Sequence, residues 1–392
     1  MGDDEFDHIS RGVLLAKGLT PYKDFYVYSP GMMLIAAIPH LFLAKSYVLL
    51  RALTGAVDFF NIILLYLYGK KIFNREIGYM AALMYLFNYV TLWNSALYMG
   101  EPYGVFLILA GLYAISSKKY FFASIFFSAT TFIKPHYTLF WIPVVVYLTY
   151  TKMHTRKVLI YPVLLTVIIV YLLSIYFDDS VSSMWIYYFI KHSSSQTVFS
   201  INNIMVNSLI LLIYLVVFET SILLVAQMNA RKLRGMRINE IHIYAASSIF
   251  FIFFPSLFPH HLQLTMPAVY LVVAQIVSTQ WKKMMENVIL MILFALIVSL
   301  PAHIILNGYP PAPYKKENVY LVVNYIKNLS NDERILSDFG FYSYFSEVDD
   351  VLNTGFHLGE HNQFNHEFVE YTLDKTKPRL IIISVKHAYP TE

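Results

Sequence analysis

The stretch Pro102–Ile133 reads PYGVFLILAGLYAISSKKYFFASIFFSATTFI and contains two apolar runs separated by a short basic turn. The runs cover 102–116 and 119–133, with Lys118 and Lys119 at the turn between them. Backbone N–H and C=O groups in hydrocarbon must pair within their own segment, so runs of this kind are typical of membrane helices. The stretch therefore predicts a helical membrane protein.

Similar apolar runs recur along the chain of 392 residues, of which 57% are apolar and only 14% are charged. The mean hydropathy of +0.53 is too high for an ordinary soluble domain of this length. The expected fold class is an all-α polytopic membrane bundle of about ten transmembrane helices. The predicted helices cover residues 51–68, 77–97, 102–116, 119–133, 137–150, 158–177, 204–226, 240–258, 262–279 and 286–306.

Basic residues gather in alternate connections between the predicted helices, and the positive-inside rule places these connections in the cytoplasm. The other connections then face outside, including residues 1–50, Lys134–His136, Pro259–His261 and everything after 307. We therefore expect a multi-pass protein of the plasma membrane with its C-terminal part outside the cell. The basic connections contain Lys70, Lys71 and Arg75; Lys118 and Lys119; Lys152, Arg156 and Lys157; Arg231, Lys232, Arg234 and Arg237; and Lys282 and Lys283.

Charge and cysteine content exclude several classes of function. The net charge of +4 is small and is distributed over short loops, so nothing indicates a nucleic-acid partner. The chain has no cysteine, which excludes disulfides and thiolate metal sites. It also begins without the basic and apolar segments of a secretory signal peptide.

The two ends of the chain differ from the predicted bundle. Residues 4–17 have the apolar stripe of an amphipathic helix on the outer surface, and residues 31–43 form a short apolar segment suited to the membrane interface. We expect a transmembrane domain over 1–306 and a small extracytoplasmic α/β domain over 307–392. In the second domain, residues 320–329 predict a helix, and residues 334–337 and 379–385 predict strands.

Acidic residues and a histidine are concentrated in the first turns of the N-terminal helix, at Asp3, Asp4, Glu5 and His8. Acids at a helix N-terminus commonly cap it, and capping alone explains them. We also expect these acids to be exposed to water at the membrane surface, where a carboxylate can act as a general base. A metal site built from Glu5 and His8 is a weaker alternative.

Other polar groups stand near the predicted outer ends of helices. Glu101 precedes a proline, which also fits simple capping, and Lys134 lies between two short apolar segments. A lysine at that depth is costly unless it reaches the interface or meets an anion. The pair His260 and His261 follows another predicted break. Further basic groups are Arg11 and Arg51. Asp58 and Glu219 lie inside predicted spans. They would serve as proton-relay residues in a transporter, or as hydrogen-bond partners between helices in a transferase.

The N-terminal sequence resembles the first external loop of the C-type (GT-C) membrane glycosyltransferases. The resemblance rests on Asp4–His8, on Gly18–Phe25 and on Pro30, in this order. It is similar to protein O-mannosyltransferases and to lipid A aminoarabinose transferases. The resemblance implies a membrane helix before the acidic pair, which this sequence lacks. The family pattern also has a charged residue where this chain has Ser29, so a phosphate contact there is not expected.

The resemblance also implies roles for single residues. Asp4 corresponds to the catalytic general base, with Glu5 beside it and Asp3 as the fallback if the register shifts by one. Glu101 corresponds to the second external acid of the family. Lys134 and one of His260 and His261 would bind the phosphate of the lipid donor. His8 and Arg11 are further substrate-binding candidates on the outer side, and Arg11 alternatively pairs with Asp7.

The function implied by the resemblance is transfer of a sugar from a polyprenyl- or dolichyl-phosphate carrier to an acceptor hydroxyl at the outer membrane face, with inversion. The expected partners are this lipid-linked sugar, membrane lipids and an acceptor, with no cofactor and no obligatory catalytic metal. No glycine-rich nucleotide loop is present, which favours a lipid-linked donor. The alternatives are a secondary transporter or lipid-linked sugar flippase, which would use Asp58 and Glu219, or an inactive relative.

Overall fold

A computed structural model describes residues 3–21, 30–42, 47–151, 156–176, 204–209, 211–212, 238–253, 259–277, 323–328, 335–337 and 380–382. The chain divides into two compact units. The first unit consists of Met1–Leu50, Ser174–Val181 and Pro310–Glu392, and the second consists of Arg51–Leu173 and Ser182–Tyr309. Glu219 and the predicted helix over 286–306 lie outside the described residues.

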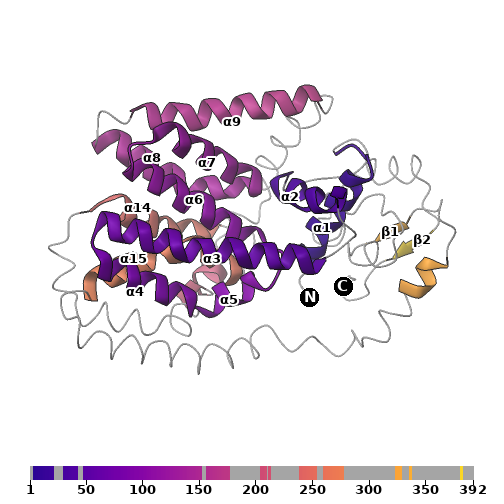
Figure 1. Cartoon of the computed structure of the whole chain (residues 1–392), viewed down its shortest axis with the longest axis horizontal. Helices are drawn as coiled ribbons and strands as arrows, with labels where there is room; N and C mark the ends of the chain where they lie inside the picture. Colours follow the sequence, from indigo (N-terminus) through magenta and orange to yellow (C-terminus); the bar gives the residue numbers. More distant parts are fainter. Residues whose placement is uncertain are drawn as a thin grey trace. The chain divides into compact units, whose positions relative to one another are not determined.

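The described part of the chain is mostly helical (Figure 1). Its helices are α1 (Asp3–Ala16), α2 (Pro30–Phe42), α3 (Tyr47–Ile72), α4 (Arg75–Leu86), α5 (Tyr89–Ser95), α6 (Gly100–Ser116), α7 (Tyr120–Ile133), α8 (Thr138–Thr151), α9 (Arg156–Tyr176), α14 (Glu240–Ala246) and α15 (Met266–Val277). Three 3-10 helices are η1 (Pro135–Tyr137), η3 (Ser247–Phe253) and η4 (Pro259–Leu264), and two strands are β1 (Ile335–Ser337) and β2 (Leu380–Ile382).

In the first unit, α1 packs against α2. The apolar stripe predicted for the N-terminal helix is buried, with Phe6, Ile9 and Val13 nearly inaccessible to solvent. Gly12 faces Ala36 of α2 so closely that an added Cβ would overlap the alanine side chain and backbone. The glycine therefore permits the close approach of the two helices.

The longest of the described helices is α3, which has 26 residues, extends beyond the predicted 51–68 at both ends and lies in the second unit from Arg51 onward. Among the described residues, α3 alone is long and apolar enough to cross a membrane as one straight helix. The pair α5 and α6 passes the same test together, although the two helices are bent by 110° at their junction. The count of about ten spans is thus not confirmed, because most described helices are shorter than predicted or broken.

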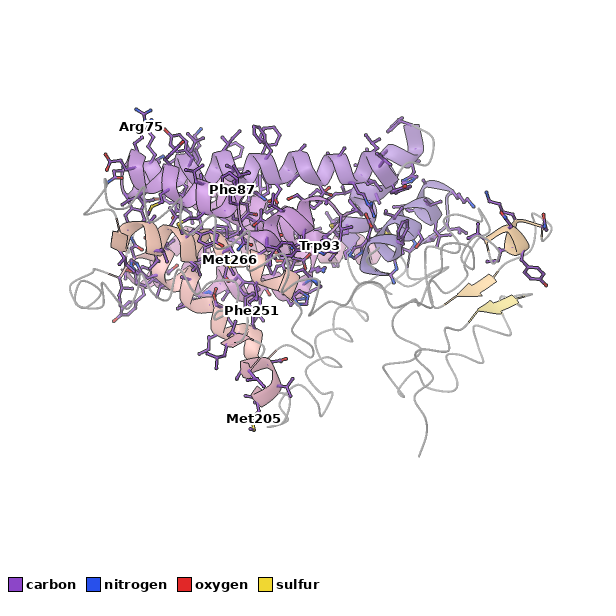
Figure 2. The ribbon with its side chains drawn as sticks, turned by 90° about the horizontal axis from the view of Figure 1, so that it is seen from below. Arg75, Phe87, Trp93, Met205, Phe251 and Met266 are labelled. Atoms are coloured by element: carbon purple, nitrogen blue, oxygen red, sulfur yellow. The ribbon has the colours of Figure 1, made fainter. Side chains whose placement is uncertain are left out.

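The predicted single helix over 77–97 is wrong, because α4 ends at Leu86 and α5 begins at Tyr89. Asn88 caps the second helix: its side-chain oxygen accepts hydrogen bonds from the amides of Val90 and Thr91. A capping side chain satisfies the amides of a new helix start, and so it competes with continuation of the previous helix. Phe87, at this break, and Trp93, on α5, are labelled in Figure 2.

The predicted meeting of two short helices near Lys134 is confirmed. Helix α7 ends at Ile133, and η1 leads into α8. Pro135 has no N–H and disfavours helical backbone in the residue before it. Lys134 accordingly has extended backbone, with φ of −147° and ψ of 127°.

The predicted helices over 240–258 and 262–279 are not α-helical throughout, because each region includes 3-10 helix. After α14 the backbone tightens into the 3-10 helix η3, and η4 precedes α15. Helix α6 packs against both α7 and η4. Three interruptions of the helical backbone, at the α5–α6 junction, at η1 and at η4, thereby belong to one packed region.

In the C-terminal part of the first unit, β1 and β2 pair in parallel. Ile335 pairs with Leu380, and Ser337 with Ile382, within the two predicted strand regions. Residues 323–327 are helical inside the predicted 320–329. The rest of the predicted α/β domain lies outside the described residues.

Candidate functional site

The first turn of α6 carries a buried carboxylate that is paired with a buried lysine. Glu101 is fully buried, and its Oε1 lies 3.0 Å from the Nζ of Lys134, which is only 4% exposed. Removing either charge from water is costly, and the opposite charge at hydrogen-bonding distance offsets that cost. The two residues therefore depend on each other for their burial.

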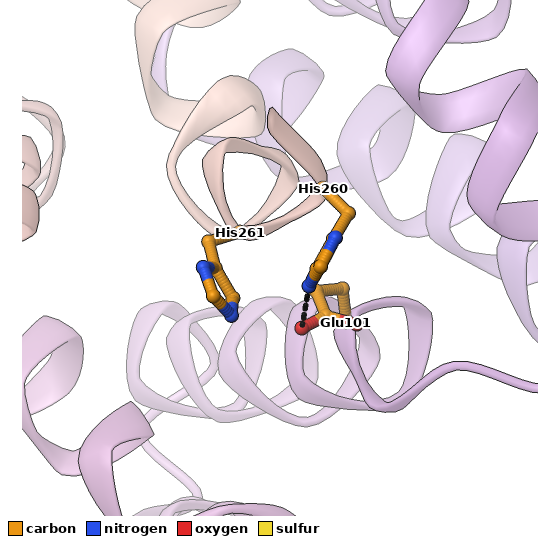
Figure 3. Close-up of side chains that lie close together, drawn as sticks. All are labelled: Glu101, His260 and His261. Atoms are coloured by element: carbon orange, nitrogen blue, oxygen red, sulfur yellow. Dashed lines mark ion pairs between the residues drawn. The ribbon is translucent and has the colours of Figure 1, made fainter. Parts of the chain in front are cut away.

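Two histidines of η4 complete this cluster (Figure 3). The Nε2 of His260 lies 3.9 Å from the Oε1 of Glu101. The rings of His260 and His261 are 4.3 Å apart between centroids, and the ring of His136 in η1 lies 6.0 Å from His261. The structure thus brings together Glu101, Lys134 and both predicted histidines, from three separate parts of the chain.

Burial determines the protonation of one of these histidines. His261 lies in η4, outside the long apolar helices, and is almost inaccessible to solvent. Burial lowers its pKa well below the ordinary value, the neighbouring His260 and Lys134 act in the same direction, and Glu101 opposes them. His261 is therefore neutral near pH 7.

The cluster also offers ligand atoms that could hold a metal ion. One ligand atom each from Glu101, His260 and His261 lies within 4.8 Å of the other two. A carboxylate with two imidazoles is a donor set that suits zinc and leaves a coordination position open. The Oε2 of Glu101 accepts no hydrogen bond in the described part of the chain, which leaves one oxygen for such an ion.

Two glycines of α6 make room for the residues around the cluster. A Cβ at Gly100 would lie 3.2 Å from the Cε of Lys134 and 3.2 Å from the hydroxyl of Tyr137. At Gly104 it would lie 2.6 Å from the Tyr137 ring, closer than real Cβ contacts allow. The small residues let η1 approach the start of α6 and hold Lys134 against Glu101.

A second buried carboxylate, Asp58, lies on α3 and is only 2% exposed. Its Oδ1 accepts hydrogen bonds from the Tyr85 hydroxyl at 2.7 Å and from Asn61 Nδ2 at 2.8 Å. The Ser95 hydroxyl lies 2.7 Å from its Oδ2, and Gln263 Nε2 lies 3.2 Å from both oxygens. Asp58 thus joins helices by hydrogen bonds, as predicted for a transferase. No pattern in the sequence indicated the role of Gln263.

The remaining predicted site residues belong to the first unit. Glu5, His8 and Arg11 are buried on α1, so the predicted exposure of Glu5 to water is wrong. At about 100° per residue, His8 and Arg11 lie away from the apolar stripe of the helix, so α1 is buried on more than one side. The backbone of Asp3 and Asp4 forms the first turn of α1, while their side chains lie outside the described residues.

No family model and no curated protein matches the chain. The solved structures that resemble it include ArnT from Cupriavidus metallidurans bound to undecaprenyl phosphate and the same protein in the apo state. The first has a TM-score of 0.56 and 12% identity, and the match covers 89% of this chain and 81% of that chain. The second has a TM-score of 0.54, 12% identity and coverages of 89% and 80%. The chain therefore has an ArnT-like membrane fold, and the predicted GT-C resemblance is confirmed at the level of the fold.

Proposed function

We propose that this chain is a GT-C-type glycosyltransferase that moves a sugar from a polyprenyl-phosphate carrier to an acceptor hydroxyl at the outer membrane face. The observation that carries this proposal is the buried Lys134, held by Glu101 where three interrupted helical segments meet. One of the two similar ArnT structures contains undecaprenyl phosphate, which supports a lipid donor of this chemical class.

In this proposal Lys134 and His260 bind the phosphate of the donor. An ammonium group has three N–H donors, so it can serve the carboxylate of Glu101 and a phosphate oxygen together. His260 is 18% exposed, more than either Lys134 or Glu101, and approaches the same carboxylate. When the glycosidic bond breaks, the leaving phosphate gains negative charge, and a cation held in place stabilises that charge.

Glu101 then acts as a positioning residue for Lys134 and His260. It is fully buried and already bonded to Lys134, which makes it a poor acceptor for a proton from substrate. The sequence-based alternative, catalysis by Glu101 itself, fits this environment less well.

Asp4 is the proposed general base. The acceptor oxygen forms a bond to the anomeric carbon, and the bond from that carbon to the donor phosphate oxygen breaks. The hydroxyl proton passes to the Asp4 carboxylate, and the lipid phosphate leaves as an anion. In-line displacement would invert the configuration of the anomeric carbon. We propose that no metal is required, because Lys134 supplies the positive charge.

The phosphate site is tested by lipid binding, which needs no knowledge of the sugar. The purified chain is placed in nanodiscs, and bound undecaprenyl phosphate is measured by native mass spectrometry. We expect Lys134→Met to weaken binding at least about tenfold, as loss of a charge-assisted bond would. Lys119→Met, at the exposed start of α7, is the matched control and should bind like the parent. Equal binding by Lys134→Met would refute the phosphate site.

The general base is tested by transfer of radiolabelled sugar in membranes. Undecaprenyl phosphate carrying labelled glucose, mannose or aminoarabinose is supplied, and Asp4→Asn is compared with Asp3→Asn. Asp4→Asn should lose transfer by at least about hundredfold while still binding undecaprenyl phosphate, because general-base catalysis contributes that much. Loss in Asp3→Asn with normal transfer in Asp4→Asn would move the base by one residue, and normal transfer in both would exclude Asp3 and Asp4 as the base.

A further inference from the structure

The bend between α5 and α6 is tied to one turn of α3 on both of its sides. On the α5 side, the Ser95 hydroxyl lies 2.7 Å from Oδ2 of Asp58. On the α6 side, Asn61 Nδ2 donates to the carbonyl of Pro102 at 2.9 Å and to Asp58 at 2.8 Å. Glu101 immediately precedes this anchored proline. The direction in which α6 presents Glu101 is therefore fixed through Asn61 and Asp58.

The η4 segment is tied to the same turn of α3. Gln263 Nε2 reaches both oxygens of Asp58 at 3.2 Å, and Gln263 Oε1 accepts from Asn94 Nδ2 at 2.6 Å. Asn94 Nδ2 also lies 3.2 Å from the backbone carbonyl of His260. A chain of hydrogen bonds thus runs from Asp58 through Gln263 and Asn94 to the backbone that carries His260.

The hydrogen-bonding side chains of this network are buried from solvent, except for Ser95, which is half-buried. Gln263 and Asn94 are inaccessible, and within the described part of the chain the side chains that hydrogen-bond to Asp58 are all neutral. Burying a carboxylate without hydrogen-bond partners costs free energy. The folded state therefore strongly favours keeping these donors in their present positions. In a buried environment such a network holds its members in one arrangement.

We propose that Asp58 and Gln263 form a positioning centre that sets the geometry of Glu101 against His260 at the neighbouring cluster. Neither residue touches that cluster with its own side chain in the described contacts. They act through the two backbone segments, at Pro102 and at His260, that carry the cluster residues. The inference concerns the geometry of the cluster, so its first test does not depend on sugar transfer.

The first test measures how accessible the histidines are to diethyl pyrocarbonate, with modified peptides quantified by mass spectrometry. In Asp58→Asn, modification of His260 and His261 should rise at least about fivefold relative to His242 of α14, because η4 opens locally. Ser128→Ala is the matched control, since it removes a buried hydrogen bond from α7 to the Pro162 carbonyl. It should leave the ratio unchanged.

The outcome that overturns the proposal is an equal rise at His242, or no rise at all. The first result would mean that Asp58 only stabilises the whole unit. If Asp58→Asn does not fold, Gln263→Met replaces it, because methionine keeps the volume and removes the hydrogen bonds of the Gln263 side chain with Asp58, Tyr85 and Asn94. The double variant Asp58→Asn with Gln263→Glu exchanges carboxylate and amide, and it should bring the ratio back toward that of the parent.

A second test measures whether Asp58 affects lipid binding through Glu101. Binding of undecaprenyl phosphate is measured for Asp58→Asn, for Glu101→Gln and for the two together. Positioning through Glu101 predicts that Asp58→Asn weakens binding by about tenfold in the parent but by less than about twofold in Glu101→Gln. Independent, multiplying effects would overturn the proposal. If the parent binds no undecaprenyl phosphate, the proposed function fails, while the accessibility test still decides the positioning centre.

Discussion

Glu101 and Asp58 are both buried carboxylates of the second unit, but their surroundings differ. Glu101 lies at the start of α6 and faces Lys134 and His260. Asp58 lies within α3 and is surrounded by neutral hydrogen-bond donors from Tyr85 and other side chains. One carboxylate is compensated by charge and the other by dipoles.

Because of this difference, the charged cluster around Glu101 can bind a further ligand, whereas the hydrogen-bonded junction around Asp58 cannot. A cation beside a carboxylate can also meet a phosphate, because charge attracts any nearby anion. Neutral donors that point at one carboxylate hold the neighbouring residues in place, and they attract a second anion only weakly. The transporter hypothesis needed Asp58 to face a cavity, and its enclosed hydrogen bonds suit a structural joint better.

The largest effect is expected from breaking the charged pair. Lys134→Met leaves the Glu101 carboxylate buried with its main counter-charge gone, and it should lower the free energy of unfolding by about 3–5 kcal/mol. Adding Glu101→Gln removes the uncompensated charge and should restore most of that loss. Thermal unfolding of the purified variants measures both. A double variant as unstable as the single one would show that the pair is not mutually dependent.

A smaller effect is expected from a substitution that crowds the packing of η1 against α6, because this packing supports the pair of Glu101 and Lys134. In Gly104→Ala the new methyl group meets the Tyr137 ring, which must shift, at a cost of about 1–3 kcal/mol. Gly55→Ala is the control on α3, because its added Cβ would make only ordinary contact at 3.5 Å with the Ser95 carbonyl. Unfolding of the two variants is compared directly, and equal stability would contradict the close packing of α6 against η1.

Loss of one neutral donor at the other carboxylate should cost less. Tyr85→Phe removes the hydroxyl that donates to Asp58, and the remaining donors limit the loss of stability to about 1 kcal/mol. A loss as large as that of Lys134→Met would mean that the two carboxylates are compensated in the same way. Thermal unfolding again provides the measurement.

Chelation should have the smallest effect on the proposed reaction. Because Lys134 carries the positive charge, treatment with EDTA should leave sugar transfer within about twofold of the untreated protein. Metal content, measured by mass spectrometry before and after treatment, shows whether Glu101, His260 and His261 hold an ion. Loss of transfer that zinc restores would assign the charge-stabilising role to a metal instead.

Local features of the fold could be predicted from the sequence because their causes are local. The amphipathic spacing of α1 and the extended backbone of Lys134 before Pro135 depend on neighbouring residues only. The break at Asn88 was missed because the apolar composition continues across it, and a capping asparagine is a weak signal within such a run. The burial of Glu5 was missed because a helix N-terminus favours acids whether or not it is exposed.

The sequence by itself determined that the chain is apolar and helical, and which charged residues stand at helix breaks. Only the tertiary structure decided which of them meet. Lys134 and Glu101 are 33 residues apart, and Gln263 and Asp58 are 205 residues apart. Contacts over such distances depend on how the segments pack, and glycines such as Gly104 set that packing without leaving a charge pattern to read. For this reason Glu101, expected at the outer end of a helix, lies buried against Lys134, and the hydrogen bonds that link Asp58 and Gln263 to its surroundings were not predicted.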